Sequence, residues 1–350
     1  MKVFVGSRTT RARNARGVGI SVYEVNETSG HLDLLHVHAE LINPSYLVLN
    51  KQGNRLYCVH GDHEEVSAFK VNSQTGELSF LNQVRTLGRN PVHLALDPSE
   101  QFLLVCNHHS GTVVVLPLNL EGGLLPVHQE VEMKGQIGPH RIEQTFAKPH
   151  SNFFDPSGRW VLIPDKGLDK IFTYEFKNGR LASSALESIS REASGPRHLS
   201  FHPMQPWVYV LNELNSTVSA CHFNSQTGEL KFFQMLPSLS ESFTSDSRAS
   251  GIQVHASGRA LYASNRGEDS IAVFQIDPDH GRLHLSQTLP SGGKTPRFFT
   301  LDPNHQWLYA CNEESDLICL FKVDQHTGAL TRADGDVVCG SPVCMAFSKH

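Results

Sequence analysis

Charged and imidazole side chains stand at both ends of one stretch of the chain, residues 195–214. Arg197 and His198 precede a short apolar run, and Glu213 follows a second apolar run. An imidazole or a carboxylate can act as a general base on a water molecule, and an arginine can stabilise an oxyanion. The three residue types could therefore serve acid–base and anion-stabilising chemistry, provided that the fold brings them together.

The elements that must position these residues are two β-strands. A turn at His202-Pro203 separates the two apolar runs, so the stretch predicts an antiparallel hairpin. Arg197 stands at the start of the first strand and Glu213 at the end of the second. Because these two ends are neighbours in an antiparallel hairpin, we expect both side chains at one rim.

This hairpin is one copy of a repeat of about 47 residues. Six units fill 44–341, five of them opening on a proline, and each continues with a third apolar run, a turn and a poorer fourth strand. Residues 1–43 hold three further strands, and the Pro-led tail supplies the missing innermost one. Four antiparallel strands per repeat predict an all-β fold, a seven-bladed β-propeller in one domain, 1–350, whose ring is closed by pairing the chain ends. The predicted blades are 342–350 with 1–43, then 44–90, 91–147, 148–195, 196–247, 248–295 and 296–341.

In such a ring, the starts of the first strands and the ends of the second strands open on the same face. This face would collect two rings of mostly titratable groups around a shared cleft. The concentration indicates a site, and a hydrated channel with mutually paired charges is the equally weighted alternative. The first ring is Tyr46, His93, His150, Arg197, His198, Gln253 and Arg297; the second is Arg8, Asp62, His108, Asp165, Lys166, Glu213, Arg266 and Glu313.

Composition narrows the classes of partner. A net charge of −5 gives no electrostatic case for nucleic acid or an anionic membrane. The seven cysteines are scattered singly, so we expect reduced thiols. No apolar run is long enough to span a membrane, and the chain enters a strand at once where a signal peptide would have an apolar segment. We therefore expect a cytoplasmic protein. No HxH, HExxH or Cys-His spacing supports a metal, and His108-His109 fits surface or core histidines better than ligands. We expect no cofactor.

Several motifs together resemble a known family, the seven-bladed lactonase propellers. It includes propeller-type 6-phosphogluconolactonases and the fungal 3-carboxy-cis,cis-muconate cyclase. The resemblance spans the whole chain and implies catalytic roles for His150, Arg197, Glu213 and Arg266. One departure is Gly251, because relatives often carry an acid before the isoleucine at this point. The matching stretches are 148–151, 195–198, 212–215, 263–266 and 295–297, with the terminal Gly340-Ser341-Pro342.

The resemblance implies hydrolysis of a sugar lactone, with 6-phosphogluconolactone as the leading substrate. His150 or Glu213 would activate a water, and Arg197 and Arg266 would stabilise the oxyanion. A lactonizing cycloisomerase that acts on a carboxylate-bearing diene is the alternative by resemblance, and a non-catalytic binding propeller is the third possibility. The oligomeric state is left open. The residues expected to bind substrate are Arg297, His93, His108, Asp165, Arg8 and Glu313.

Overall fold

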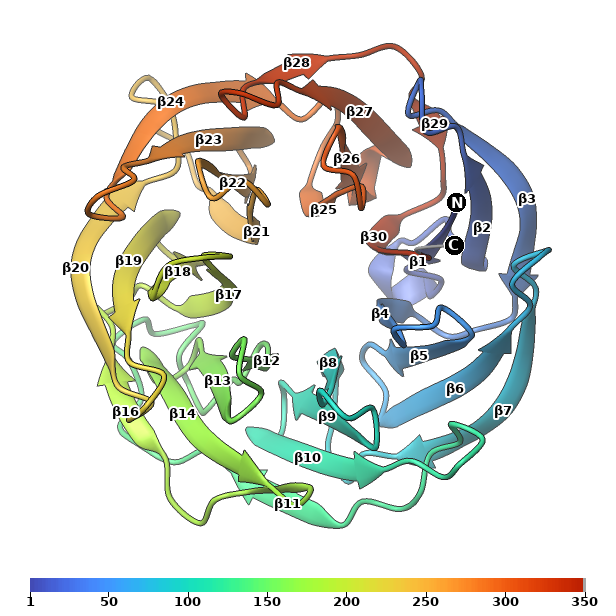
Figure 1. The fold of residues 1–350 in the computed structure, drawn as a ribbon, viewed down its shortest axis with the longest axis horizontal. Coiled ribbons are helices and arrows are strands. Elements are labelled where there is room, and N and C mark those ends of the chain that lie inside the picture. The colour runs from blue at the N-terminus through green and yellow to red at the C-terminus, as the bar shows by residue number, and fades with distance from the viewer. Residues whose placement is uncertain (349–350) are drawn as a thin grey trace.

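Seven antiparallel sheets follow one another around a central axis in the computed structural model, which describes residues 1–348 (Figure 1). The first strand of each sheet lies nearest the axis, and most of these strands begin at a proline. The innermost strands are β30 (Pro342–Phe347), β4 (Pro44–Leu49), β8 (Pro91–Leu96), β12 (Phe153–Phe154), β17 (Pro196–Phe201), β21 (Arg248–Val254) and β25 (Pro296–Leu301).

The second and third strands of each sheet are the most deeply buried. They are rich in β-branched and aromatic residues, which suit a sheet that packs on both faces. The second strands are β1 (Lys2–Ser7), β5 (Arg55–His60), β9 (Phe102–Asn107), β13 (Trp160–Asp165), β18 (Trp207–Asn212), β22 (Ala260–Arg266) and β26 (Trp307–Asn312). The third are β2 (Gly19–Val25), β6 (Glu65–Val71), β10 (Thr112–Pro117), β14 (Lys170–Lys177), β19 (Thr217–Phe223), β23 (Ser270–Ile276) and β27 (Leu317–Val323).

The outer strands are more exposed and less regular. Short extra strands, β15 (Arg180–Leu181) and β29 (Val337–Val338), accompany them in two sheets, and two short 3-10 helices, η1 (Arg11–Arg13) and η2 (Glu313–Ser315), lie in loops. The predicted all-β propeller of seven four-stranded blades is confirmed. The outer strands are β3 (Leu32–Ala39), β7 (Leu78–Arg85), β11 (Gln129–Glu132), β16 (Leu186–Ile189), β20 (Leu230–Pro237), β24 (Leu283–Pro290) and β28 (Leu330–Arg332).

The two ends of the chain share one sheet, whose strand order is β3-β2-β1-β30. Strand β30 pairs antiparallel with β1, with Phe4 opposite Ala346 and Val5 opposite Met345. Figure 1 shows the two strands side by side near the labelled ends of the chain. The predicted closure by the C-terminal strand is therefore confirmed, while residues 349 and 350 of the predicted first blade lie outside the described residues. Pairing the ends removes two sheet edges that would otherwise be open.

The hydrophobic core is divided into clusters that lie between neighbouring sheets. One cluster joins Tyr209 and Leu211 of β18 with Leu261 of β22 and Phe274 of β23, all fully buried. A buried polar hydroxyl needs a partner, and Tyr209 donates to the carbonyl of Gly281, in the turn of the next sheet, at 3.0 Å. Equivalent bonds tie three further sheets to their neighbours and run from Tyr57 to Gly122, Tyr262 to Gly328 and Tyr309 to Gly30.

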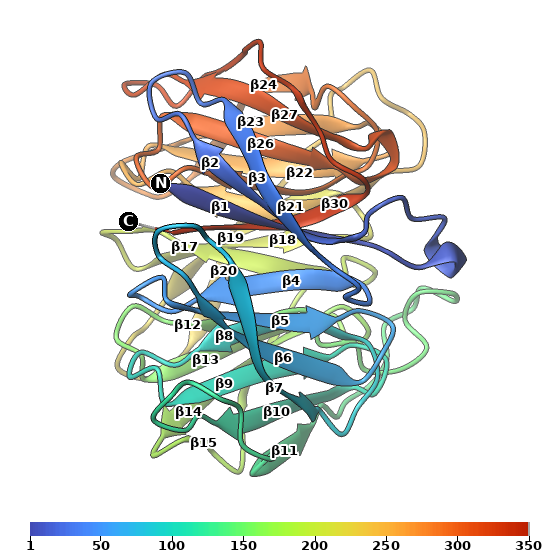
Figure 2. The ribbon, with the colours of Figure 1, turned by 90° about the vertical axis from the view of Figure 1, so that its right-hand side faces the viewer.

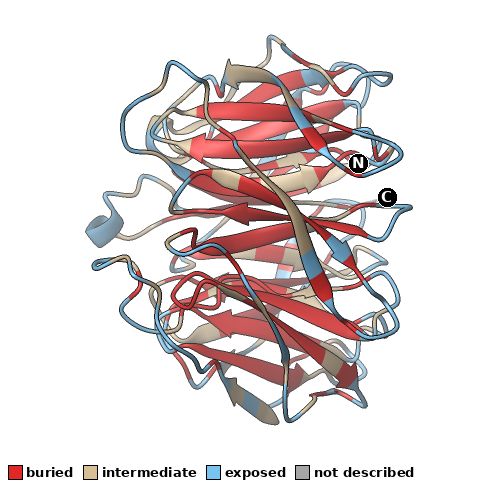
Figure 3. Ribbon diagram, turned by 90° about the vertical axis from the view of Figure 1, so that its left-hand side faces the viewer, coloured by how far each residue is buried: buried red, intermediate tan, exposed pale blue. Residues whose placement is uncertain are grey.

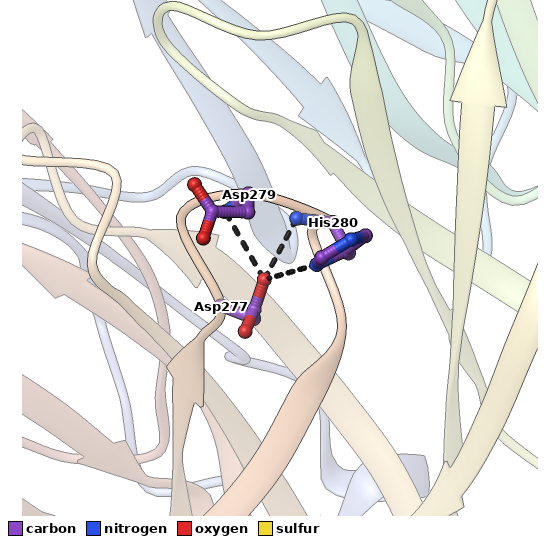
Figure 4. Close-up of side chains that lie close together, drawn as sticks. All are labelled: Asp277, Asp279 and His280. Atoms are coloured by element: carbon purple, nitrogen blue, oxygen red, sulfur yellow. Dashed lines mark hydrogen bonds and ion pairs between the residues drawn. The ribbon is translucent and has the colours of Figure 1, made fainter.

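The turns between third and fourth strands repeat one hydrogen-bonding pattern. In the turn after β23, Asp277 Oδ1 accepts from the backbone N–H of Asp279 at 3.0 Å and of His280 at 2.7 Å, and it lies 3.1 Å from His280 Nδ1 (Figure 4). Short Asn and Asp side chains favour such turns. Within residues 1–348, these three residues are the one group of His, Cys, Asp or Glu close enough to share a metal ion, and their geometry is that of the turn. Asn26, Asn72, Asn224 and Asp324 make the same turn.

The strands run through the thickness of the ring, so their ends define two faces. The loop that holds η1 projects from one of these faces (Figure 2). Exposed residues gather in the loops at both faces and on the outer strands, while the inner strands are buried (Figure 3). All seven cysteines are buried and unpaired. Neither helix of the described residues has the length or the apolar character needed to cross a bilayer.

Candidate active site

Strands β17 and β18 hold Arg197 and Glu213 at the face from which η1 projects. Pro196 pairs with Asn212, and a register shift between Pro196 and His198 leaves Arg197 in a bulge. From there, Arg197 Nη1 donates to Glu213 Oε2 at 2.6 Å. A bulge commonly changes the direction of one side chain of a strand, and here it turns the Arg197 side chain toward the axis. The structure thus brings together the two rim residues of the hairpin.

Glu213 sits in a cage of cations. Its carboxylate lies 3.0 Å from Lys166 Nζ and 3.3 Å from an Arg266 guanidinium nitrogen, in addition to Arg197, and only 3 % of the residue is exposed. Burial alone would raise the pKa of Glu213, but Lys166, Arg266 and Arg197 together hold it well below its ordinary value. The carboxylate therefore stays ionised and is a weak proton acceptor.

His150 is the third member of this cluster. Arg197 Nη1 lies 2.5 Å from His150 Nε2. Because a guanidinium can only donate, Nε2 must be the acceptor, and the ring proton is then on Nδ1, which is buried and has no hydrogen-bond partner. Burial and the charge of Arg197 keep the pKa of His150 well below its ordinary value, so the imidazole is neutral. Arg197 thus joins the histidine to the caged carboxylate.

A cleft of about 650 Å³ opens on the same face. Arg266 and Arg297 lie in its lining, and Arg297 Nη1 lies 3.7 Å from Glu313, which also lines the cleft. The charged lining residues are six cations and three carboxylates, so the cleft favours an anionic ligand. The cations are Arg13, Arg16, Arg248, Arg266, Lys294 and Arg297, and the carboxylates are Asp246, Glu313 and Glu314.

The residues selected from the sequence separate into four groups by position. Arg266, Arg297 and Glu313 line the cleft. A second cavity, of about 20 Å³, is lined by Arg8, His150, Arg197 and again Arg297. Glu213 lies behind Arg266. Besides Glu213, three further selected residues lie in the lining of neither cavity of the described chain, namely His93, His108 and Asp165.

These three residues have local partners instead. His93 stacks against Tyr46, with 4.3 Å between the ring centroids, and burial lowers its pKa to about 3. The His108 ring lies 4.9 Å from that of His150. Asp165 Oδ1 accepts backbone N–H groups of Lys148, Gly167 and Leu168 at 2.8–3.0 Å, and burial raises its pKa to about 7. Asp165 thus organises the loop that presents Lys166.

Among the residues near the site that were not selected from the sequence, two belong to the charge network around Glu213. Glu143, in the long loop between β11 and β12, accepts from Lys166 Nζ at 3.1 Å and from Arg248 Nη1 at 2.5 Å. Arg248 opens β21, pairs with Arg266 in the sheet and lies 4.0 Å from Glu213. The loop of Glu143 has no periodic pattern, whereas Arg248 could have been found by extending the sixth innermost strand backward by two residues.

Gly251, the departure from the family pattern named in the sequence analysis, is buried against the neighbouring sheet. A Cβ atom at this position would lie 3.0 Å from two ring carbons of Phe299 and 3.3 Å from Ser264 Oγ. The Gly251 N–H also donates to Ser264 Oγ at 2.9 Å. An acidic side chain here would have to displace the phenyl ring. The packing of Phe299 therefore explains why this position holds a glycine.

Comparison with known proteins identifies the family. Residues 2–347 match the family model described as lactonase, seven-bladed β-propeller. The chain is 36 % identical to a 6-phosphogluconolactonase of Bacillus subtilis, over 94 % of both chains, and 33 % identical to one of Formosa agariphila, over 96 % of both. It superposes on the periplasmic gluconolactonase of Pseudomonas aeruginosa with a TM-score of 0.89 and 27 % identity, over 98 % of both chains. The chain belongs to the lactonase family of seven-bladed β-propellers.

Proposed function

We propose that this protein hydrolyses a phosphorylated sugar lactone, with 6-phosphogluconolactone as the substrate. The observation that carries the proposal is the cleft lined by six cations and three carboxylates, with Arg266 in contact with the caged Glu213. Two relatives above 30 % identity bear the name 6-phosphogluconolactonase. An anionic phosphate is the group that such a cleft binds best.

In the proposed reaction, a water adds to the lactone carbonyl carbon and the carbonyl oxygen becomes an oxyanion. Arg266 lines the cleft and would stabilise this charge, together with Arg197, which contacts the same carboxylate of Glu213. The tetrahedral intermediate then collapses, the ester bond to the ring oxygen breaks, and that oxygen leaves as a hydroxyl group after receiving the proton that the base took from the attacking water. Arg297 would hold the phosphate away from the reacting carbon.

Between the two bases considered, the geometry favours His150 over Glu213. The carboxylate of Glu213 is enclosed by Lys166, Arg197 and Arg266 and lies in the lining of neither cavity, whereas His150 lines the smaller cavity beside the cleft. Its Nε2 lone pair is engaged by Arg197, so it can accept a proton only when Arg197 turns toward the substrate oxygen. The role of Glu213 is then to hold Arg197, Arg266 and Lys166 in position.

The test is an assay of the purified protein with phosphorylated gluconolactone, plain gluconolactone and a carboxymuconate. Ester hydrolysis releases acid, and cyclisation of the diene consumes a chromophore instead. We expect acid release from the phosphorylated lactone and a loss of about 10²–10³-fold in kcat for Arg266→Ala. The matched control is Arg259→Ala, an exposed arginine in the turn between β21 and β22.

If the purified protein cyclises the diene and releases no acid from the lactones, it is a cycloisomerase and the proposal is wrong. Equal loss in Arg266→Ala and Arg259→Ala would show that the cleft is not the site. The cytoplasmic location stays a prediction, which fractionation of cells can test, since one similar protein is a periplasmic gluconolactonase.

A further inference from the structure

The smaller cavity is lined mainly by residues of the innermost strands, and we call it the throat. Arg297 lines both the throat and the cleft. The volume of the throat is about 20 Å³, and Arg8, Ser45 and Tyr46 contribute to its lining. About 10–15 Å³ is enough for one water molecule, while sites for organic ligands are about 300–1,000 Å³. The cavity therefore has room for one monatomic ion or one water, and it is too small for a phosphate ester.

The charge of this lining is entirely positive. Three guanidinium groups, of Arg8, Arg197 and Arg297, contribute to it, and no carboxylate in the described chain does. Arg197 is held by Glu213 and Arg297 faces Glu313 at 3.7 Å, whereas Arg8 is only 2 % exposed and has no hydrogen-bonded carboxylate among residues 1–348. A buried charge is costly unless it is paired. A bound anion would compensate the positive charge of this lining.

The donors of Arg8 are free to bind one. Its Nε and Nη1 atoms are buried without hydrogen-bond partners. The carboxylate of Asp62 is 3.6 Å from Nη1, beyond hydrogen-bonding distance, and both of its oxygens are taken by Arg13. Burial and the charge of Arg297 lower the pKa of Arg8 to about 10, which leaves the guanidinium charged at neutral pH.

Ser45 supplies a second unsatisfied donor beside Arg8. Its hydroxyl is buried and has no hydrogen-bond partner. A Cβ atom added at Gly61 would meet both Arg8 Nη1 and Ser45 Oγ, which shows that the two polar atoms lie side by side. A water in this place would leave the positive charge of the three guanidinium groups uncompensated, whereas an anion would neutralise part of it.

We propose that this throat is a binding site for a monatomic anion, of which chloride is the abundant example. Arg8 Nε and Nη1 and the Ser45 hydroxyl donate to the ion, and the guanidinium groups of Arg197 and Arg297 complete the positive shell. The site does not depend on the proposed lactone hydrolysis, although it borders His150 and Arg197.

The experiment measures thermal unfolding of the purified protein at constant ionic strength while sodium methanesulfonate is replaced by sodium chloride or bromide. A ligand that binds only the folded state raises the melting temperature with saturation. We expect a saturating rise of about 2–4 °C with either halide. The rise should be absent in Arg8→Gln and in Gly61→Ala, whose methyl group displaces the guanidinium, and it should persist in Arg259→Gln. A bromide-soaked crystal should give an anomalous peak beside Arg8 and Ser45.

Three outcomes would overturn the site. They are no halide-specific rise in the parent protein, a rise that survives in Gly61→Ala, and bromide peaks confined to the surface. If Arg8→Gln does not fold, the Gly61→Ala variant and the crystal decide. Lactone hydrolysis is measured in methanesulfonate alone, so a failure of the anion site and a failure of the proposed activity are separate results.

Discussion

Arg197 Nη1 lies 2.6 Å from Glu213 Oε2, and both side chains are buried at the same end of one hairpin. A pair buried in this way stabilises the fold only while it is intact, because either partner alone would be an uncompensated charge. The pair therefore links the stability of the site to its chemistry.

Removing the Arg197 side chain should lower both the stability of the protein and its catalytic rate. We expect Arg197→Ala to lower the free energy of unfolding by about 3–5 kcal/mol and kcat by about 10²–10³-fold. Glu213→Gln should destabilise as well, because Lys166 and Arg266 then lose their shared carboxylate. Chemical denaturation of both single variants and of the double variant measures the coupling. Costs that simply add would show that the two side chains do not act as a pair.

Arg297 should discriminate between phosphorylated and plain lactones. It lines the cleft and has only a 3.7 Å contact to Glu313, so its guanidinium can engage a phosphate. Loss of a charge-assisted bond costs about 1.5–3 kcal/mol, which corresponds to about 10–150-fold. Arg297→Ala should raise KM for phosphorylated gluconolactone by this factor and leave KM for gluconolactone nearly unchanged. Equal changes for the two substrates would remove Arg297 from phosphate binding.

The buried imidazoles should make the protein sensitive to acid. Burial lowers the pKa of His93, His108, His150 and His198 below the value of about 6.5 in an unfolded chain. Below about pH 6.5 the unfolded chain then binds more protons than the folded one, so stability falls as the pH falls. Each histidine contributes up to about 1.4 kcal/mol per pH unit. Asp165, with its pKa raised to about 7, acts in the opposite direction between about pH 7 and 4.

Urea unfolding at pH 7.5, 6.5 and 5.5 measures this slope. His198→Gln should reduce it by about one proton, because one depressed imidazole is removed. The matched control is His284→Gln on the outer strand β24, which is exposed and should leave the slope unchanged. A parent protein whose stability is independent of pH over this range would contradict the buried neutral histidines.

Glu143 should hold the loop between β11 and β12 in place. It bonds Lys166 and Arg248, and its carbonyl accepts from Lys148 Nζ at 2.7 Å. Glu143→Ala removes two charge-assisted bonds, so we expect amide exchange in this loop to accelerate about 10-fold or more. Glu130→Ala on exposed β11 is the control. Unchanged exchange in both variants would mean that other contacts hold the loop.

The architecture and the meeting of Arg197 with Glu213 could be predicted because both follow from local pattern. Strand alternation, a proline at the first strand and a turn near residue 202 fix which ends of the hairpin are neighbours. The repeat then fixes the ring, and the number of strands left at each end of the chain gives its closure by β30.

How deeply each side chain of the site is enclosed could not be predicted in the same way. Arg8 and Arg266 are both second-strand ends in the sequence, yet Arg266 lines the open cleft while Arg8 is enclosed in the throat. The difference depends on how far neighbouring loops reach over each strand. Glu143 was missed for the same reason, because its partners Lys166 and Arg248 are 23 and 105 residues away in the chain.

The pairing of β30 with β1 also has a consequence for biosynthesis. During translation, the first three strands leave the ribosome early but lack their inner neighbour until Pro342–Phe347 has been made. The nascent chain must therefore carry an unfinished sheet until β30 has been synthesised, and the ring can close only after that point.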